Sequence, residues 1–217
     1  MPLNQGFIVD SYRFYQIAKD GYSKAREGFE IHTQNDALVS IIFSALALEA
    51  FINEIPAIAK CEKQAVSTEA FLDKLIDAIE ESGSNKKNTQ HKFMLASEAL
   101  NSPLEKGKPP YQDFADLFEL RDCLVHLKPK DVIEEQEDGE MKYFGRDLIK
   151  RLRDKNMFLD TSVDSIILKV STAKAAFWAC NTASEMVKEI LDKLPASFTD
   201  KNPQIDKYRG EFQPLQK

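Results

Sequence analysis

The sequence predicts an all-α protein, an up-and-down helical bundle with one small insertion before its last long helix. The chain is rich in the strong helix formers Ala, Leu, Glu and Lys, and no glycine occurs between Phe29 and Ser82. Apolar residues recur three or four positions apart along most of the chain, as on one face of a helix. With 217 residues, 43% of them hydrophobic, the chain is long enough to bury a real core.

The apolar stripes and the turn residues between them divide the chain into segments. Asn35-Asp36 precedes the second stripe, and Pro56 is expected to end or kink that helix. Three prolines between 101 and 110 form a connector, and Asp160-Thr161-Ser162 offers a cap for the last helix. We expect helices at about 9–29, from after Asp36 to Pro56, and at 68–81, 90–100, 111–127 and 163–194, with a basic amphipathic turn or two at 146–155.

One domain is expected over residues 1–194, with the segment 131–160 inserted into it. Within the insertion, Asp138-Gly139 lies between the short apolar runs 132–133 and 141–144, which favours a small β-hairpin. Residues 195–217 are expected to form an irregular C-terminal tail, either loose or wrapped over a neighbour.

Charge and composition exclude several classes of function. A net charge of −6 disfavours a protein that holds nucleic acid by bulk electrostatics. No two glycines are two positions apart, so the glycine-rich dinucleotide loop is absent. Three scattered cysteines and three scattered histidines form neither a disulfide framework nor a zinc motif, so no metal or cofactor is predicted.

A cytoplasmic protein without a membrane anchor is expected. The first residues lack a basic region followed by an apolar core, so they do not resemble a signal peptide. The most apolar stretch, Ala37 to Leu48, is free of charge for only 12 residues, which is too short to span a bilayer.

Arg121 is the residue that departs most clearly from the helical pattern. The expected helix 111–127 carries Phe114, Leu117, Phe118 and Leu124 along its apolar stripe, and Arg121 occupies a position on the same stripe. Burying a guanidinium without a partner is costly, so Arg121 needs a carboxylate, a phosphate or solvent from a cleft.

His126 follows five residues later, and Asp122 lies one helical turn before it. Histidine is the usual proton-transfer residue at neutral pH, and Asp122 could orient its imidazole. A histidine and an arginine together suit metal-independent RNA cleavage that leaves a 2′,3′-cyclic phosphate, because one moves protons and the other stabilises charge on phosphorus. Residues five apart on a helix point about 140° away from each other. Either the helix unwinds before Pro129, or two copies meet across a two-fold axis.

Arg121-Asp-Cys-Leu-Val-His126 resembles the R-x4-6-H motif of the HEPN superfamily. The residues 110–120 before the motif and Lys128-Pro129 after it are similar to its usual surroundings. The segment Ala45–Glu54 is similar to an early core helix of such proteins. The resemblance covers the helices at 34–60, 111–127 and 163–194, but neither the insertion nor the tail.

The resemblance implies a HEPN-like bundle and a ribonuclease that acts as a homodimer on RNA, in a toxin–antitoxin, phage-defence or RNA-processing role. Arg121 and His126 would be the catalytic pair, with Asp122 in place of the more frequent Asn. An antitoxin or another protein is the further partner that it implies. Some family members are inactive and only mediate interactions, so a non-catalytic interaction or regulatory module is the alternative function.

Structural roles for the same residues stay open at this stage. Glu49 also lies on an apolar stripe, beside Asn53, and an ion pair of Glu49 with Arg121 would satisfy both charges without any function. His126 could merely cap the end of its helix. The acidic run at 134–140 is either a solvated loop or a gate. Six basic residues either contact the RNA backbone or form a solvated face: Lys128, Lys130, Arg146, Lys150, Arg151 and Arg153.

Overall fold

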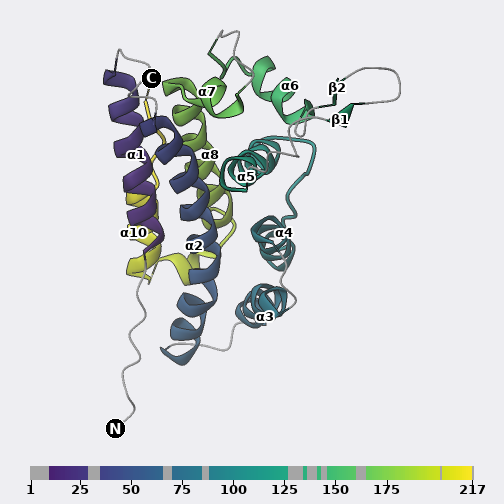
Figure 1. Ribbon diagram of the computed structural model, residues 1–217. Coiled ribbons are helices and arrows are strands. Elements are labelled where there is room, and N and C mark those ends of the chain that lie inside the picture. Colours follow the sequence, from purple (N-terminus) through teal and green to yellow (C-terminus); the bar gives the residue numbers. More distant parts are fainter. Residues whose placement is uncertain are drawn as a thin grey trace.

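The computed structural model describes residues 10–28, 35–65, 70–84, 88–126, 134–135, 141–142, 146–159, 165–200 and 202–216. Most of these residues are helical, so the predicted all-α bundle is confirmed (Figure 1). The helices are α1 (Ser11–Glu27), α2 (Asn35–Ala65), α3 (Ala70–Ser84), α4 (Thr89–Ala99), α5 (Tyr111–Val125), α6 (Arg146–Asp154), α7 (Ile166–Val170), α8 (Ala173–Leu191), α9 (Ala196–Thr199) and α10 (Pro203–Glu211).

Helices α1, α2 and α8 pack against one another, with α1 at one edge of the bundle (Figure 1). Gly21 allows the close approach of α1 to α2, since a Cβ atom at this position would lie 2.7 Å from the carbonyl oxygen of Asp36. The hydroxyl of Ser40 reaches the carbonyl oxygen of Ala176, and that of Ser44 reaches the thiol of Cys180. Ser44 follows Ser40 along α2 just as Cys180 follows Ala176 along α8, so the two helices run parallel. The bundle is therefore not up-and-down at this interface.

Helix α2 is the most apolar element of the bundle. Residues Asn35–Cys61 are long and apolar enough to cross a membrane by length and composition, a test that the core helix of a soluble protein also passes. Ile41, Leu48, Phe51 and Ile55 of this helix are fully buried in the bundle core. Their burial accounts for the apolar character of α2. The helix also continues through Pro56 to Ala65.

Helix α5 lies against α2 and α8, and α6 packs on α5. Phe114, Leu117 and Leu120 of α5 are fully buried, which fixes the rotation of the helix and so places its polar residues. In the insertion, β1 (Glu134–Glu135) pairs antiparallel with β2 (Met141–Lys142), with Glu134 opposite Lys142. The proposed turn at 138–139 lies outside the described residues.

The prediction of one long helix over 163–194 is wrong at Ser171-Thr172, where the chain leaves α7 and starts α8. The hydroxyl of Thr172 accepts the backbone N–H of Ala175 at 2.9 Å and donates to the carbonyl oxygen of Met157 at 2.8 Å. Hydroxyl side chains compete with helical backbone bonds in this way, so Thr172 adopts an extended backbone and caps α8.

The tail is not irregular, because α9 and α10 form within it. Asn202 caps α10 and Pro203 occupies its first turn, a start signal present in the sequence. Ile205, Tyr208 and Phe212 are buried against the bundle. The segment after α10 lies against the bundle, since Tyr15 of α1 donates a hydrogen bond of 2.8 Å to the carbonyl oxygen of Gln213. A loose tail is therefore wrong for the described residues, which pack on the bundle of the same chain.

Candidate functional site

A polar cavity of about 550 Å³ lies where α4, α5 and Glu49 of α2 meet. We call it the Arg121 cavity. Three carboxylates line it, together with the start of α4 and one aromatic ring. Its lining consists of Glu49, Asn88, Thr89, Gln90, Lys92, Ala115, Phe118, Glu119, Arg121 and Asp122.

The Arg121 guanidinium lies in this cavity between two carboxylates. Its Nη2 atom is 3.5 Å from an oxygen of Glu49, and its Nη1 atom donates to Asp122 at 2.8 Å. The Arg121 side chain is 23% exposed, that of Glu49 43% and that of Asp122 59%. The Glu49–Arg121 pair anticipated from the sequence is thus present, but both groups remain open to water in the cavity.

His126 stands at the end of α5 and is exposed. Its backbone N–H still donates to the carbonyl oxygen of Asp122 at 2.9 Å, so the helical path reaches His126 without unwinding. The residues that line the Arg121 cavity do not include His126. Within one protomer, the structure therefore brings Arg121, Asp122 and Glu49 together and leaves His126 apart from them.

Asp122 does not act on the imidazole in this arrangement. Its carboxylate accepts a hydrogen bond from Arg121, whereas its carbonyl oxygen accepts the backbone N–H of His126. Asn53, the second supporting residue, accepts a hydrogen bond of 2.6 Å from Lys92. Lys92 lines the cavity together with Arg121, whereas Asn53 does not. Asn53 therefore positions a second cation of the cavity without being part of its lining.

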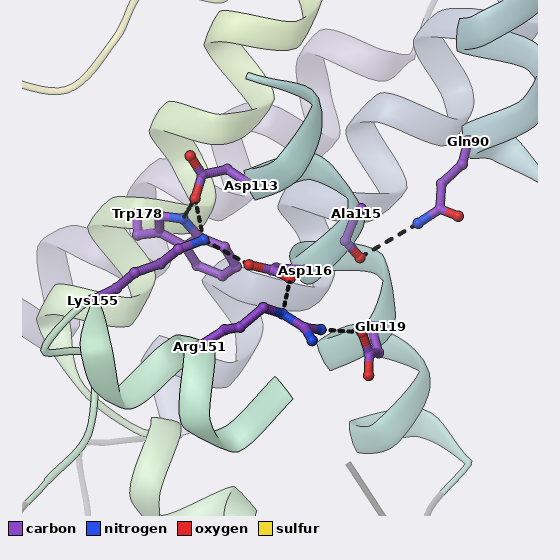
Figure 2. A network of polar contacts seen from close by, with 8 residues as sticks. All are labelled: Gln90, Asp113, Ala115, Asp116, Glu119, Arg151, Lys155 and Trp178. Atoms are coloured by element: carbon purple, nitrogen blue, oxygen red, sulfur yellow. Dashed lines mark hydrogen bonds and ion pairs between the residues drawn. The ribbon is translucent and has the colours of Figure 1, made fainter. Parts of the chain in front are cut away.

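The six basic candidates for RNA contact have different surroundings. Lys128, Lys130 and the side chain of Arg146 lie outside the described residues. Lys150 and Arg153 are exposed on α6. Arg151 binds two carboxylates instead, since it donates to Asp116 at 2.7 Å and to Glu119 at 2.5 Å (Figure 2).

Arg151 belongs to a polar network between α5, α6 and α8 that the sequence analysis missed (Figure 2). Asp116, only 4% exposed, also accepts a hydrogen bond of 2.6 Å from Lys155. Asp113 accepts hydrogen bonds from Lys155 at 2.5 Å and from the indole N–H of Trp178 at 2.8 Å. The signal was the i, i+3 spacing of Asp113 and Asp116, which places both carboxylates on one face of α5.

The network keeps Lys155 charged. Burial alone would lower the pKa of this amine, but the hydrogen bonds to Asp113 and Asp116 outweigh burial and raise the pKa above its ordinary value. The same balance between burial and the Asp116 carboxylate raises the pKa of Arg151.

No group of three or more His, Cys, Asp or Glu side chains is placed to hold a metal ion in the described part of the chain. The polar groups of the Arg121 cavity can bind an anion through Arg121 and Lys92, or a basic side chain of a partner through one of the carboxylates. Comparison with protein-family models, with curated proteins and with solved structures gives no match.

Proposed function

We propose that the protein is a metal-independent endoribonuclease of the HEPN type, which acts as a cytoplasmic homodimer in a toxin or phage-defence role. One observation carries the proposal: Arg121 interrupts the apolar stripe of α5 and opens into a polar cavity instead of being closed off by its ion pairs. Ion pairs with exposed carboxylates are weak, so a phosphate can replace Glu49 or Asp122 as the partner of Arg121.

A second protomer supplies the histidine in this proposal. Because α5 stays helical up to the amide of His126, Arg121 and His126 point in directions about 140° apart. One protomer then cannot place both side chains on one phosphate. Val125, next to His126, is 49% exposed, which leaves an apolar surface for a partner at the same end of α5.

The chemistry needs only these two groups. The ribose 2′-oxygen attacks phosphorus and loses its proton to a base, while the bond from phosphorus to the 5′-oxygen breaks and that oxygen receives a proton. His126 accepts the proton of the 2′-hydroxyl and, as the imidazolium, donates it to the 5′-oxygen, while Arg121 stabilises the extra negative charge on the phosphoryl oxygens. The products are a 2′,3′-cyclic phosphate and a 5′-hydroxyl.

The first experiment measures RNA cleavage in the presence of a chelator. Arg121→Ala and His126→Ala should each reduce the rate by about 10² or more. Arg13→Ala is the matched control, since Arg13 is an exposed arginine on α1, and it should cleave at the wild-type rate. A strand with 2′-deoxyribose throughout should remain intact. Wild type that cleaves no RNA would contradict the proposal.

Melting temperatures separate catalysis from folding. Arg121→Ala leaves Glu49 without its partner, so the Glu49→Gln, Arg121→Met double variant is measured beside it. If this double variant folds well but cleaves nothing, Arg121 acts on phosphate. A variant that keeps cleaving shows that Arg121 has a structural role only.

Mixing subunits tests the composite site. Arg121→Ala and His126→Ala subunits, unfolded and refolded together, form mixed dimers in half of the cases, and each mixed dimer has one complete site. Activity should return to about a quarter of the wild-type value. If activity does not return, either both groups act within one protomer or the protein is not a dimer.

The acidic lining favours a second candidate, a non-catalytic HEPN-like interaction module. Glu49, Glu119 and Asp122 surround Arg121 and would repel RNA, but they suit a basic segment of a protein partner such as an antitoxin. This candidate replaces the first one if no RNA is cleaved and the chain instead binds a protein through the Arg121 cavity.

A further inference from the structure

A second cavity, of about 530 Å³, lies where the end of α1, the end of α6 and the start of α8 meet. We call it the Trp178 cavity. It is lined by three cations and three aromatic rings, and its lining includes no carboxylate in a chain whose net charge is −6. The lining consists of Tyr22, Arg26, Lys155, Asn156, Met157, Ala173, Lys174, Phe177 and Trp178.

Two of the cations carry uncompensated charge. Lys155 forms ion pairs with Asp113 and Asp116, which do not line the cavity, so its charge is balanced within the protein. Arg26 and Lys174 are exposed, and no hydrogen bond or ion pair holds either side chain in the described part of the structure. The cavity thus offers two free positive charges to an anion.

The aromatic rings are held in fixed orientations. The indole N–H of Trp178 donates to Asp113, and the Lys155 ammonium lies 5.4 Å from the centre of the Trp178 ring. Figure 2 shows these groups on the side of the network away from Gln90. Phe177 packs against Tyr22 with ring centres 5.6 Å apart. Phe177 and Trp178 are half-buried, so part of each ring faces the cavity.

Aromatic rings beside free cations are the features with which proteins bind single-stranded nucleic acid, since every base offers a flat surface for stacking and every nucleotide carries a phosphate. We propose that the Trp178 cavity binds an unpaired nucleobase of single-stranded RNA, stacked on Trp178 or Phe177, with the neighbouring phosphates on Arg26 and Lys174. The proposal extends the proposed function and rests on it, because the RNA is that function's substrate. A cavity of this volume is within the usual size range of small-ligand sites.

The binding experiment uses a short oligouridine whose riboses are all 2′-O-methylated, so that cleavage cannot occur. Trp178 is the only tryptophan of the chain, and its fluorescence therefore reports directly on this cavity. Titration of the strand should quench the fluorescence with the same dissociation constant that a labelled strand gives by anisotropy. The same strand paired with its complement should not quench it, because paired bases cannot enter the cavity.

Matched double variants test the role of the two cations. Arg26→Ala with Lys174→Ala removes two contacts to phosphate, so affinity should fall about tenfold or more. The slope of log K against the logarithm of the salt concentration should become shallower by about 1.4, which is about 0.7 for each lost phosphate contact. Arg13→Ala with Lys188→Ala removes the same charges from the same helices at the opposite end of the bundle, and it should bind like wild type (Figure 1).

Phe177→Leu tests stacking at nearly constant volume. Loss of one stacked base should weaken binding about fivefold, with the melting temperature little changed. Inorganic phosphate alone should not quench Trp178, and uridine monophosphate should bind more weakly than the strand.

Three outcomes would overturn the proposal. The strand could bind without quenching Trp178, the two double variants could lose affinity equally, or uridine monophosphate could bind as tightly as the strand, which would indicate a free-nucleotide site. Cleavage of unmodified RNA is measured separately. Quenching without cleavage would support the binding site and contradict the proposed nuclease activity. Cleavage without quenching would support the nuclease activity and contradict the binding site.

Discussion

The Arg121 cavity and the Trp178 cavity are nearly equal in volume and opposite in charge. In the first, Arg121 lies among Glu49, Glu119 and Asp122. In the second, Arg26 and Lys174 lie beside aromatic rings with no carboxylate in the lining. A compensated arginine can exchange its partner only if those partners are weakly held, whereas free cations are available to an anion at once. In the proposed function, the first cavity would serve cleavage and the second the binding of RNA.

One ionic network connects the two cavities (Figure 2). Glu119 lines the Arg121 cavity and binds Arg151, which binds Asp116. Asp116 in turn binds Lys155, which lines the Trp178 cavity. Asp116 is nearly fully buried and its two cations are partly buried, whereas Glu49 and Asp122 are largely open to water. The comparison predicts that charges in the network are structural and that charges around Arg121 are replaceable.

The largest effect is expected at Asp116. Asp116→Ala removes the buried carboxylate from Arg151 and Lys155 and should lower the free energy of unfolding by about 3 kcal/mol. This is the low end of the range for a broken buried pair, because each cation keeps a second carboxylate. Urea unfolding measures the change, with Asp77→Ala, an exposed acid on α3, as the control. A loss no greater than that of the control would show that the network is not structural.

An intermediate effect is expected at Trp178. Trp178→Phe keeps the aromatic ring but removes the N–H that donates to Asp113, so stability should fall by about 1.5 kcal/mol, as for one hydrogen bond to a charged group. Thermal and urea unfolding measure this change. If the variant is as stable as wild type, Asp113 does not hold the ring in place.

The smallest effect is expected at Glu49. Its pair with Arg121 is 3.5 Å long and partly exposed, so Glu49→Gln should change the free energy of unfolding by no more than about 0.5 kcal/mol. RNA binding should become tighter, because one carboxylate leaves the cavity. A loss of 2 kcal/mol or more would mean that Glu49 and Arg121 form a fixed structural pair, and the comparison between the cavities would fail.

Several features of the candidate site followed from the pattern of residues. Arg121 on the apolar stripe of α5 indicated a partner, and Glu49 on the stripe of α2 was the carboxylate found beside it. For Arg151 the sequence left an RNA contact or a solvated face as alternatives, but its guanidinium instead binds the carboxylates of Asp116 and Glu119. The position of Trp178 at a cavity could not be predicted, because a sequence does not show which aromatic side chains line a cavity.

The sequence by itself determined the helical fold class and most of the helices before residue 163, because helix propensity and the spacing of apolar residues act within a few turns. It also contained the caps at Thr172 and Asn202, since such caps are local hydrogen bonds. Only the tertiary structure decided that α2 and α8 run parallel, and that the tail folds over the bundle. It also decided which cations are paired, since Asp116 and Lys155 are 39 residues apart. Such contacts depend on how the whole chain packs, and a local sequence pattern does not predict them.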